Sequence, residues 1–127
     1  HMFFRLMHDK GVLHRVFTQN IDGLEVMAGV PKEKVIAAHG CFDTSSCVDC
    51  KEPMDSIELR DKIFRREVPV RCPKCNGYVK PDIVFFGESL PRRFHESRIS
   101  DFAEADLLII MGTSLKVAPF NGLPGDV

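Results

Sequence analysis

Four of the five cysteines stand in two pairs with the spacing C-x2-C. The first pair is Cys47 and Cys50, and the second is Cys72 and Cys75. Two thiolates at this spacing can converge on one ion, and two such pairs supply the tetrahedral shell of four sulfurs that Zn²⁺ prefers. Nothing at the start of the chain resembles a secretory signal, which disfavours disulfides. We therefore predict one bound zinc ion; two disulfides, a redox-active pair and an iron site are the alternatives.

A closed shell of four sulfurs leaves no open position on the metal, so the predicted zinc is structural and activates no water. Cys41 and His39, in the stretch "AAHGCF", then fall outside the shell. A lone histidine in an apolar stretch is often only a buried, hydrogen-bonded side chain. Here, however, a predicted strand ends at His39, and Gly40 gives the backbone room to turn. A neutral imidazole at such an edge can accept a proton, so His39 is a candidate general base.

Three further polar clusters follow stretches that are typical of strands, and ligands bind at strand ends in open α/β sheets. The amide and carboxylate groups of "TQNID" could hold a ribose or a carboxamide. The glycine, hydroxyls and N–H groups of "GTS" suit phosphate or ribose oxygens. The third cluster is "GE", which follows "IVFF". A single cluster of this kind is more often a turn or a helix cap. These three clusters and "HG", all at strand ends, together indicate a ligand site. The first two clusters offer Gln19, Asn20, Asp22, Gly112, Thr113 and Ser114.

Strands and helices must alternate along the chain to bring these residues together. Short runs that end in glycine or polar residues predict strands at residues 12–18, 35–40, 83–87 and 106–112. Helical patterns occupy residues 3–11, 21–29, 55–66 and 89–105. Nearly continuous apolar runs are typical of strands covered on both faces, as in a parallel sheet. The expected fold class is therefore α/β, with a small zinc-binding module of residues 41–78 inserted between two strands.

Two of the expected helices carry specific signals. Asp55 is a candidate N-cap, and Glu58 can complete a capping box with it. A proline marks the start of the last helix. Its residues Phe94, Ile99 and Phe102 are expected to face the core.

Charge and hydropathy disfavour two classes of partner. The chain of 127 residues has 17 basic and 18 acidic residues, with a formal net charge of -1. Proteins that bind nucleic acid usually show a basic excess or a basic face, so we expect no direct contact with nucleic acid. No apolar run approaches the roughly twenty residues of a membrane span, so we expect no contact with a membrane. Without a secretory signal, the expected location is the cytoplasm, the nucleus or both.

Five motifs together resemble one family, the sirtuins, which are NAD-dependent protein lysine deacylases. They are "TQNID", "AHG", the two C-x2-C pairs, "KPDIVFFGE" and "MGTSLKVAPF", and they extend over nearly the whole chain, from about Phe3 to Phe120. The resemblance implies a Rossmann-type parallel sheet with helices, here partial, formed by residues 3–40 and 79–127. It also implies the inserted four-cysteine zinc module and a cleft for NAD and acetyl-lysine.

The resemblance also implies roles for particular residues. It implies catalysis by His39, Asn20 and Asp22. NAD contacts are implied for Gln19, Asn20, Asp22, His39, Gly112, Thr113 and Ser114. Contacts to the acetylated peptide are implied for Val84, Phe85, Gly87, Glu88 and Val117. The implied partners are acetylated proteins similar to histones or tubulin, and the implied products are lysine, nicotinamide and O-acetyl-ADP-ribose.

Two family features are missing from this chain. Sirtuins have a glycine-rich phosphate turn ahead of these motifs and further NAD-binding strands after them, whereas no G-x-G occurs here. We therefore expect this chain to be a central piece of the core that binds NAD weakly or not at all and self-associates through an exposed sheet. One alternative is a catalytically inactive, zinc-stabilised module that captures peptides at the "FFGE" strand edge. The other is a zinc-ribbon nucleic-acid binder, which the charge balance disfavours.

Overall fold

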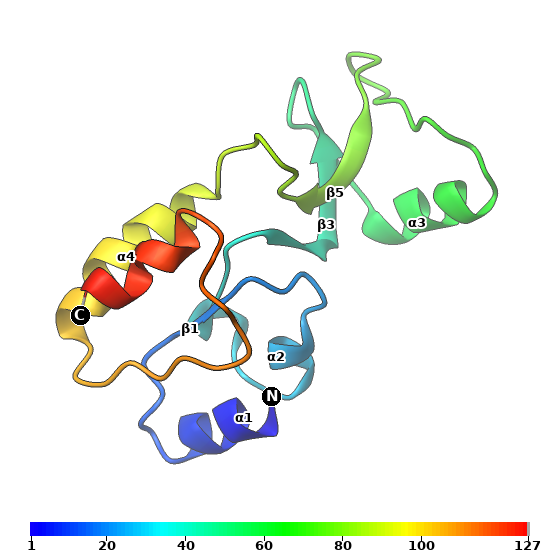
Figure 1. The fold of residues 1–127 in the computed structure, drawn as a ribbon. Coiled ribbons are helices and arrows are strands. Elements are labelled where there is room, and N and C mark those ends of the chain that lie inside the picture. The colour runs from blue at the N-terminus through cyan, green and yellow to red at the C-terminus, as the bar shows by residue number, and fades with distance from the viewer. Residues whose placement is uncertain (127) are drawn as a thin grey trace.

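Short strands and helices alternate along residues 1–126, the part of the chain that the structure, a computed structural model, describes (Figure 1). The elements are α1 (Met2–Asp9), β1 (Val16–Thr18), α2 (Leu24–Met27), the 3-10 helix η1 (Lys32–Lys34), β2 (Val35–Ala37), β3 (Gly40–Cys47), β4 (Pro53–Met54), α3 (Ser56–Phe64), β5 (Val79–Ile83), α4 (Arg92–Glu104) and the 3-10 helix η2 (Phe120–Asp126). Within residues 1–126, no helix combines the length and apolar character needed to cross a membrane. The mixed α/β class expected from the sequence is confirmed.

The parallel sheet is smaller than the sequence predicted. Only β1 and β2 pair in parallel, with Val16 opposite Val35. Residues 106–112 form no strand, and the side chains of Leu107, Ile109, Ile110 and Met111 are 43–71% exposed. A strand needs a hydrogen-bonded neighbour, and none of the described residues pairs with this segment. The prediction of a strand there is therefore wrong for this structure.

The predicted strand at 83–87 is also wrong, because only Ile83 of this range lies in a strand and that strand is not parallel to its neighbour. The observed strand, β5, ends at Ile83 and pairs antiparallel with β3 in a second sheet of order β4-β3-β5. Beyond it the chain turns at Gly87, whose φ is +87°, and Phe86 is fully exposed. Apolar composition alone could not distinguish a buried parallel strand from this exposed turn.

Helix α3 packs beside the second sheet. A cluster of buried residues connects them and consists of Leu59, Cys47, Val70, Cys72 and Val79. The predicted cap is confirmed, because the Asp55 carboxylate accepts the backbone N–H groups of Ile57 and Glu58 at 2.9 Å each. The Glu58 carboxylate pairs instead with Lys62 at 2.8 Å. Figure 1 shows β3, β5 and α3 on one side of the molecule and β1, α1 and α4 on the other.

Helix α4 covers the parallel pair with one apolar face. Phe94 is fully buried and Phe102 is 8% exposed, and both belong to a core cluster with Ile36 and Phe120. Ile99 was expected to face this core as well, but its side chain is 78% exposed. The 3.6-residue period explains the error, since Ile99 lies about 140° around the helix from Phe94 and about 60° from Phe102.

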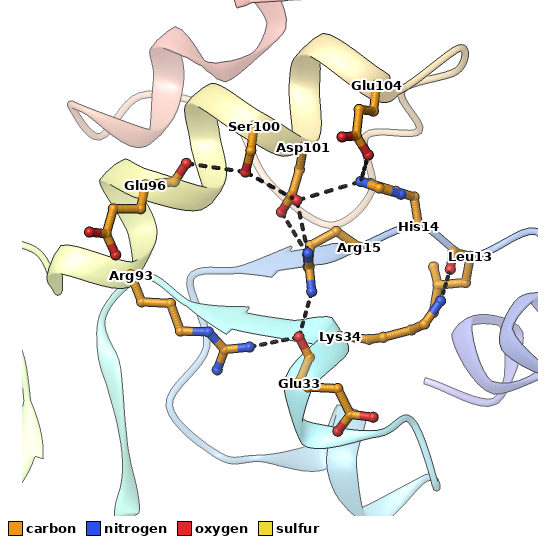
Figure 2. Close-up of polar contacts among 10 residues, drawn as sticks. All are labelled: Leu13, His14, Arg15, Glu33, Lys34, Arg93, Glu96, Ser100, Asp101 and Glu104. Carbon is orange, nitrogen blue, oxygen red and sulfur yellow. Dashed lines mark hydrogen bonds and ion pairs between the residues drawn. The ribbon is translucent and has the colours of Figure 1, made fainter.

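A buried ion pair fixes α4 to the strands (Figure 2). The guanidinium group of Arg15 donates to both carboxylate oxygens of Asp101, at 2.6 and 2.8 Å. Asp101 is only 5% exposed. Arg15 also donates to the backbone carbonyl of Glu33 at 2.5 Å, and Arg93 donates to the same oxygen at 2.6 Å. These contacts join α4, the start of β1 and the turn that leads into β2.

Candidate functional site

The four predicted metal ligands lie together. Their sulfur atoms are all within 4.8 Å of one another, with Cys47 and Cys75 at 3.5 Å and Cys50 and Cys72 at 3.6 Å. All are free thiols, because a disulfide would require a separation of about 2.0 Å. A tetrahedron with bonds of about 2.3 Å to a central ion has edges of roughly 3.8 Å, close to the spacing found. The group could therefore hold one metal ion.

Local backbone geometry shapes the second cysteine pair into a knuckle. The backbone N–H groups of Lys74 and Gly77 each donate to a cysteine sulfur at 3.4 Å. Glycine is favoured at position 77, because a Cβ there would lie 2.9 Å from the sulfur of Cys47 and 2.2 Å from an Asp49 carboxylate oxygen. The Asn76-Gly77 turn of the sequence thus has a steric cause.

The thiols influence one another's ionisation. The backbone N–H of Cys50, assisted by that of Asp49, lowers the pKa of Cys47 to about 7. The N–H of Gly77 acts in the same direction on Cys75, but the neighbouring sulfurs outweigh it and raise the pKa of Cys75 to about 12. All four groups can be thiolates together only around a shared cation that neutralises them. This donor set fits Zn²⁺, which binds thiolates.

The parallel pairing of β1 with β2 places His39 beside Gln19. The Nδ1 atom of His39 lies 2.9 Å from the backbone carbonyl oxygen of Gln19. A carbonyl oxygen only accepts hydrogen bonds, so Nδ1 carries the proton and Nε2 is left as the acceptor. The hydroxyl of Thr113 donates to the side-chain oxygen of Gln19 at 2.8 Å. Three predicted site residues from three separate segments therefore converge.

Gly40 has to be glycine for His39 to lie where it does. Its φ is +74°, and a Cβ at this position would lie 1.9 Å from the backbone oxygen of Asp82. The close approach lets the backbone N–H of Val84 donate to the carbonyl of His39 at 2.9 Å. The predicted catalytic residue and the first predicted peptide contact are thus joined through their backbones.

The other predicted NAD contacts make local hydrogen bonds. Asn20 is exposed, and its backbone N–H donates to the Thr18 hydroxyl at 3.2 Å. The Asp22 carboxylate accepts the N–H of Leu24 at 3.0 Å, at the start of α2. Gly112 and Ser114 flank Thr113 and are exposed. The structure places all of them on loops that also carry Gln19 or Thr113.

The predicted peptide contacts at 84–88 form a closed turn. The Glu88 carboxylate accepts the backbone N–H of Phe85 at 2.8 Å, and the N–H of Glu88 donates to the carbonyl of Phe85 at 3.0 Å. The N–H of Phe85, followed by the ammonium of Lys80, holds the pKa of Glu88 below its usual range. Phe85 is 53% exposed, and Val117, just before η2, is 46% exposed.

Sequence reasoning missed two sets of residues around the site. Lys80 contacts the turn at residues 84–88. The ion pair of Arg15 with Asp101 connects α4 to the start of β1, the strand that precedes Gln19. Lys80 opens the motif "KPDIVFFGE", but the sequence did not predict that its side chain contacts the turn. The Arg15 and Asp101 pair spans distant segments and has no local signal in the sequence.

Residues 1–119 match the model of the Sir2 family. The chain is 52% identical over 126 residues to the NAD-dependent deacetylase sir2A of Dictyostelium discoideum, covering 97% of this chain and 24% of the relative. It is 52% identical over 123 residues to the NAD-dependent protein deacetylase sirtuin-3 of Mus musculus, covering 97% and 36%. To the NAD-dependent protein deacetylase sirtuin-2 of Danio rerio it is 51% identical over 125 residues, covering 97% and 33%. The chain thus spans about a quarter to a third of the length of these curated relatives.

Proposed function

Because its sequence matches the Sir2 family over residues 1–119, this chain belongs to that family, and we propose that the whole protein containing it is an NAD-dependent protein lysine deacylase. Its products would be the free lysine, nicotinamide and O-acetyl-ADP-ribose. The observation that carries the proposal is the convergence of Gln19 and His39, which follow the paired strands β1 and β2, with Thr113 from a distant loop. Two relatives named as NAD-dependent deacetylases are each 52% identical to it over 97% of its length.

In the proposed deacylation reaction, His39 acts as the general base. NAD supplies the ribose whose hydroxyl must lose a proton before the acetyl group can be transferred. The bond from Nδ1 to the Gln19 carbonyl leaves Nε2 free to take that proton. General-base contributions of this kind are typically 10²–10⁴-fold in rate.

Polar groups on the loops that carry Gln19 and Thr113 are suited to the rest of NAD. Amide, hydroxyl and carboxylate groups bind ribose, carboxamide and phosphate oxygens through hydrogen bonds. The groups proposed for this role belong to Gln19, Asn20, Asp22, Gly112, Thr113 and Ser114. The proposal assigns Asn20 and Asp22 a part in catalysis as well, through their place on the loop after β1.

The exposed turn after β5 is proposed to bind the acetylated peptide. Val84, Phe85, Gly87 and Glu88 form one side of this site and Val117 the other. The exposure of Phe85 and Val117 supports the assignment, because both side chains offer apolar surface to an acyl-lysine. We propose acetylated proteins similar to histones or tubulin as substrates, and the cytoplasm, the nucleus or both as the location.

The four cysteines are proposed to bind one structural zinc ion. Cys47, Cys50, Cys72 and Cys75 close the shell, which leaves no place for a catalytic water. We also propose that residues 41–78 form a zinc module and that residues 3–40 and 79–127 belong to a Rossmann-type domain.

A zinc-stabilised peptide-binding module is the second candidate function. The exposed "FFGE" turn is the observation that favours it, because it offers a surface to peptides without any need for NAD. The deciding experiment incubates the whole protein with NAD and an acetyl-lysine peptide and measures nicotinamide release. Release that requires both reactants supports the enzyme. Peptide binding without any release supports the module instead.

A further inference from the structure

The ammonium group of Lys80 contacts the end of β5 and two residues of the turn that follows it. It donates to the backbone carbonyl of Ile83 at 2.5 Å and to the Glu88 carboxylate at 3.2 Å. It also lies 4.7 Å from the centroid of the Phe85 ring, within the range of a cation–π interaction. A backbone carbonyl, a carboxylate and an aromatic ring thus share one cation.

The carboxylate that Lys80 contacts also closes the turn. The same Glu88 oxygen accepts the backbone N–H of Phe85 at 2.8 Å, and the N–H of Glu88 donates back to the carbonyl of Phe85. The chain reverses at Gly87, where φ is +87°. The orientation of Phe85 therefore depends on a carboxylate that Lys80 holds in place.

An ordinary surface ion pair would have little effect, so the surroundings of Lys80 matter. The Lys80 side chain is 23% exposed and that of Glu88 is 41% exposed. By contrast, Lys62 and Glu58 on α3 form a pair of the same residue types at 33% and 54% exposure. Exposed pairs of that second kind contribute little. Lys80 differs because it is a residue of β5, where it lies opposite Ser46 of β3. Its ammonium group contacts Glu88 in the turn.

We propose that Lys80 is a positioning residue for peptide recognition: its ammonium group orients Phe85 and neutralises Glu88 in the turn that binds the acetylated peptide. The inference rests on the proposed function for the assignment of that turn. With Lys80 in place, the Glu88 carboxylate exerts little net field on a bound peptide. Without the ammonium group, an uncompensated negative charge at the turn attracts peptides with basic flanks and repels acidic ones.

The test replaces Lys80 in the whole protein. Lys80→Met keeps the apolar stem and removes the charge, Lys80→Arg keeps a cation, and Lys62→Met is the matched control. Steady-state rates are measured with NAD and three acetyl-lysine peptides, whose flanking residues are Gly and Ala, Arg, or Glu. The Kd of each peptide, fluorescently labelled, is measured in parallel by anisotropy, which reports on the turn without requiring turnover.

Lys80→Met should raise the KM and Kd of the Gly and Ala peptide about fivefold to thirtyfold, with kcat and the KM for NAD unchanged within about twofold. Its preference for the Arg-flanked over the Glu-flanked peptide should rise at least about threefold. Lys80→Arg should restore most of the affinity, and Lys62→Met should behave as wild type. The double variant Lys80→Met/Glu88→Gln should lose the new preference for basic flanks, because the uncompensated charge is gone.

Unchanged peptide affinity and preference in Lys80→Met would overturn the inference, as would an equal loss of NAD and peptide affinity. If Lys80→Met does not fold, failure of Lys80→Arg to bind the peptide normally would overturn it as well. An inactive wild-type protein would defeat the proposed function alone, since the labelled peptides still report on Lys80. If the wild type is active and the Lys80 variants keep its peptide affinity and flank preference, only this inference is overturned.

Discussion

The imidazole of His39 and the backbone carbonyl of Gln19 are joined by a hydrogen bond of 2.9 Å from Nδ1. The two residues follow strands that pair in parallel, so the pairing of Val16 with Val35 determines which carbonyl the ring can reach. A backbone acceptor cannot rotate away or change its protonation, so the ring keeps one tautomer. The sheet itself thereby prepares Nε2 to accept a proton.

Replacement of Gly40 should disturb this arrangement from the backbone. In Gly40→Ala the new Cβ would lie 1.9 Å from the Asp82 oxygen, at a φ of +74° that L-residues rarely adopt. A left-handed conformation alone costs about 1–2 kcal/mol, so we expect the free energy of unfolding to fall by at least about 2 kcal/mol. Urea titration measures it. Gly125→Ala, with nothing within 4 Å, is the control and should change it little.

One zinc ion per chain should stabilise the module of residues 41–78 and the strand β5 that pairs with it. Metal binding and folding are coupled in small metal-binding modules, so removal of zinc with a chelator should abolish amide protection in β3, α3 and β5 first. Elemental analysis and hydrogen exchange measure the two effects. Cys72→Ser should behave like the chelated protein, whereas Cys41→Ser should keep its zinc. A fully protected module without metal, or a disulfide among the four cysteines, would show that the prediction is wrong.

The ion pair of Arg15 with Asp101 should make stability depend on pH. Burial raises the pKa of Asp101, but the hydrogen bonds and charge of Arg15 outweigh it and hold that pKa below its usual range. A lowered folded pKa contributes stability above the unfolded value, and this contribution is lost as the pH falls from about 4 through the folded pKa.

Asp101→Asn should therefore lower the free energy of unfolding by about 3–5 kcal/mol at pH 7, because it leaves a partly buried guanidinium without its partner. The difference from wild type should shrink below about pH 4. Asp61→Asn removes an exposed partner of Arg60 and should cost less than about 1 kcal/mol. Equal losses in the two variants would contradict a special role for the buried pair.

The exposed apolar segment at residues 107–111 should make the isolated chain self-associate. Leu107 is 71% exposed and Ile110 is 47% exposed, in a run of apolar residues that pairs with no described strand. Sedimentation velocity should show dimers or larger species at micromolar concentration, and Leu107→Lys/Ile110→Lys should shift the chain toward monomer. Ile99→Lys removes a single exposed apolar side chain on α4 and should leave association unchanged. A monomeric wild-type chain would refute the prediction.

Local signals in the sequence predicted the local structure well. The C-x2-C spacing predicted the convergence of the four sulfurs, and Asp55 caps α3 as its position indicated. The polar clusters "TQNID", "HG" and "GTS" correctly marked segments that meet, because strand pairing connects the first two and the Thr113 hydroxyl adds the third.

Features that depend on distant partners could not be predicted in this way. The apolar runs at 83–87 and 106–112 favour strands, but a strand forms only where another strand lies beside it. The pairing of β5 with β3 brings Gly40 against the backbone of Asp82, a contact that no single segment reveals. Ion pairs such as Arg15 with Asp101 and the contacts of Lys80 likewise join side chains whose proximity arises only in the fold.

The most direct measurement is the rate of nicotinamide release by the whole protein with NAD and an acetyl-lysine peptide, comparing wild type with His39→Ala and His39→Tyr. We predict NAD-dependent turnover by wild type and a loss of at least about a hundredfold in both variants, with zinc content and the free energy of unfolding unchanged. Cys41→Ser, two residues away, should retain most of the activity. Near-normal turnover by the His39 variants, or a loss of their fold in place of their activity, would contradict the assignment of His39 as the general base.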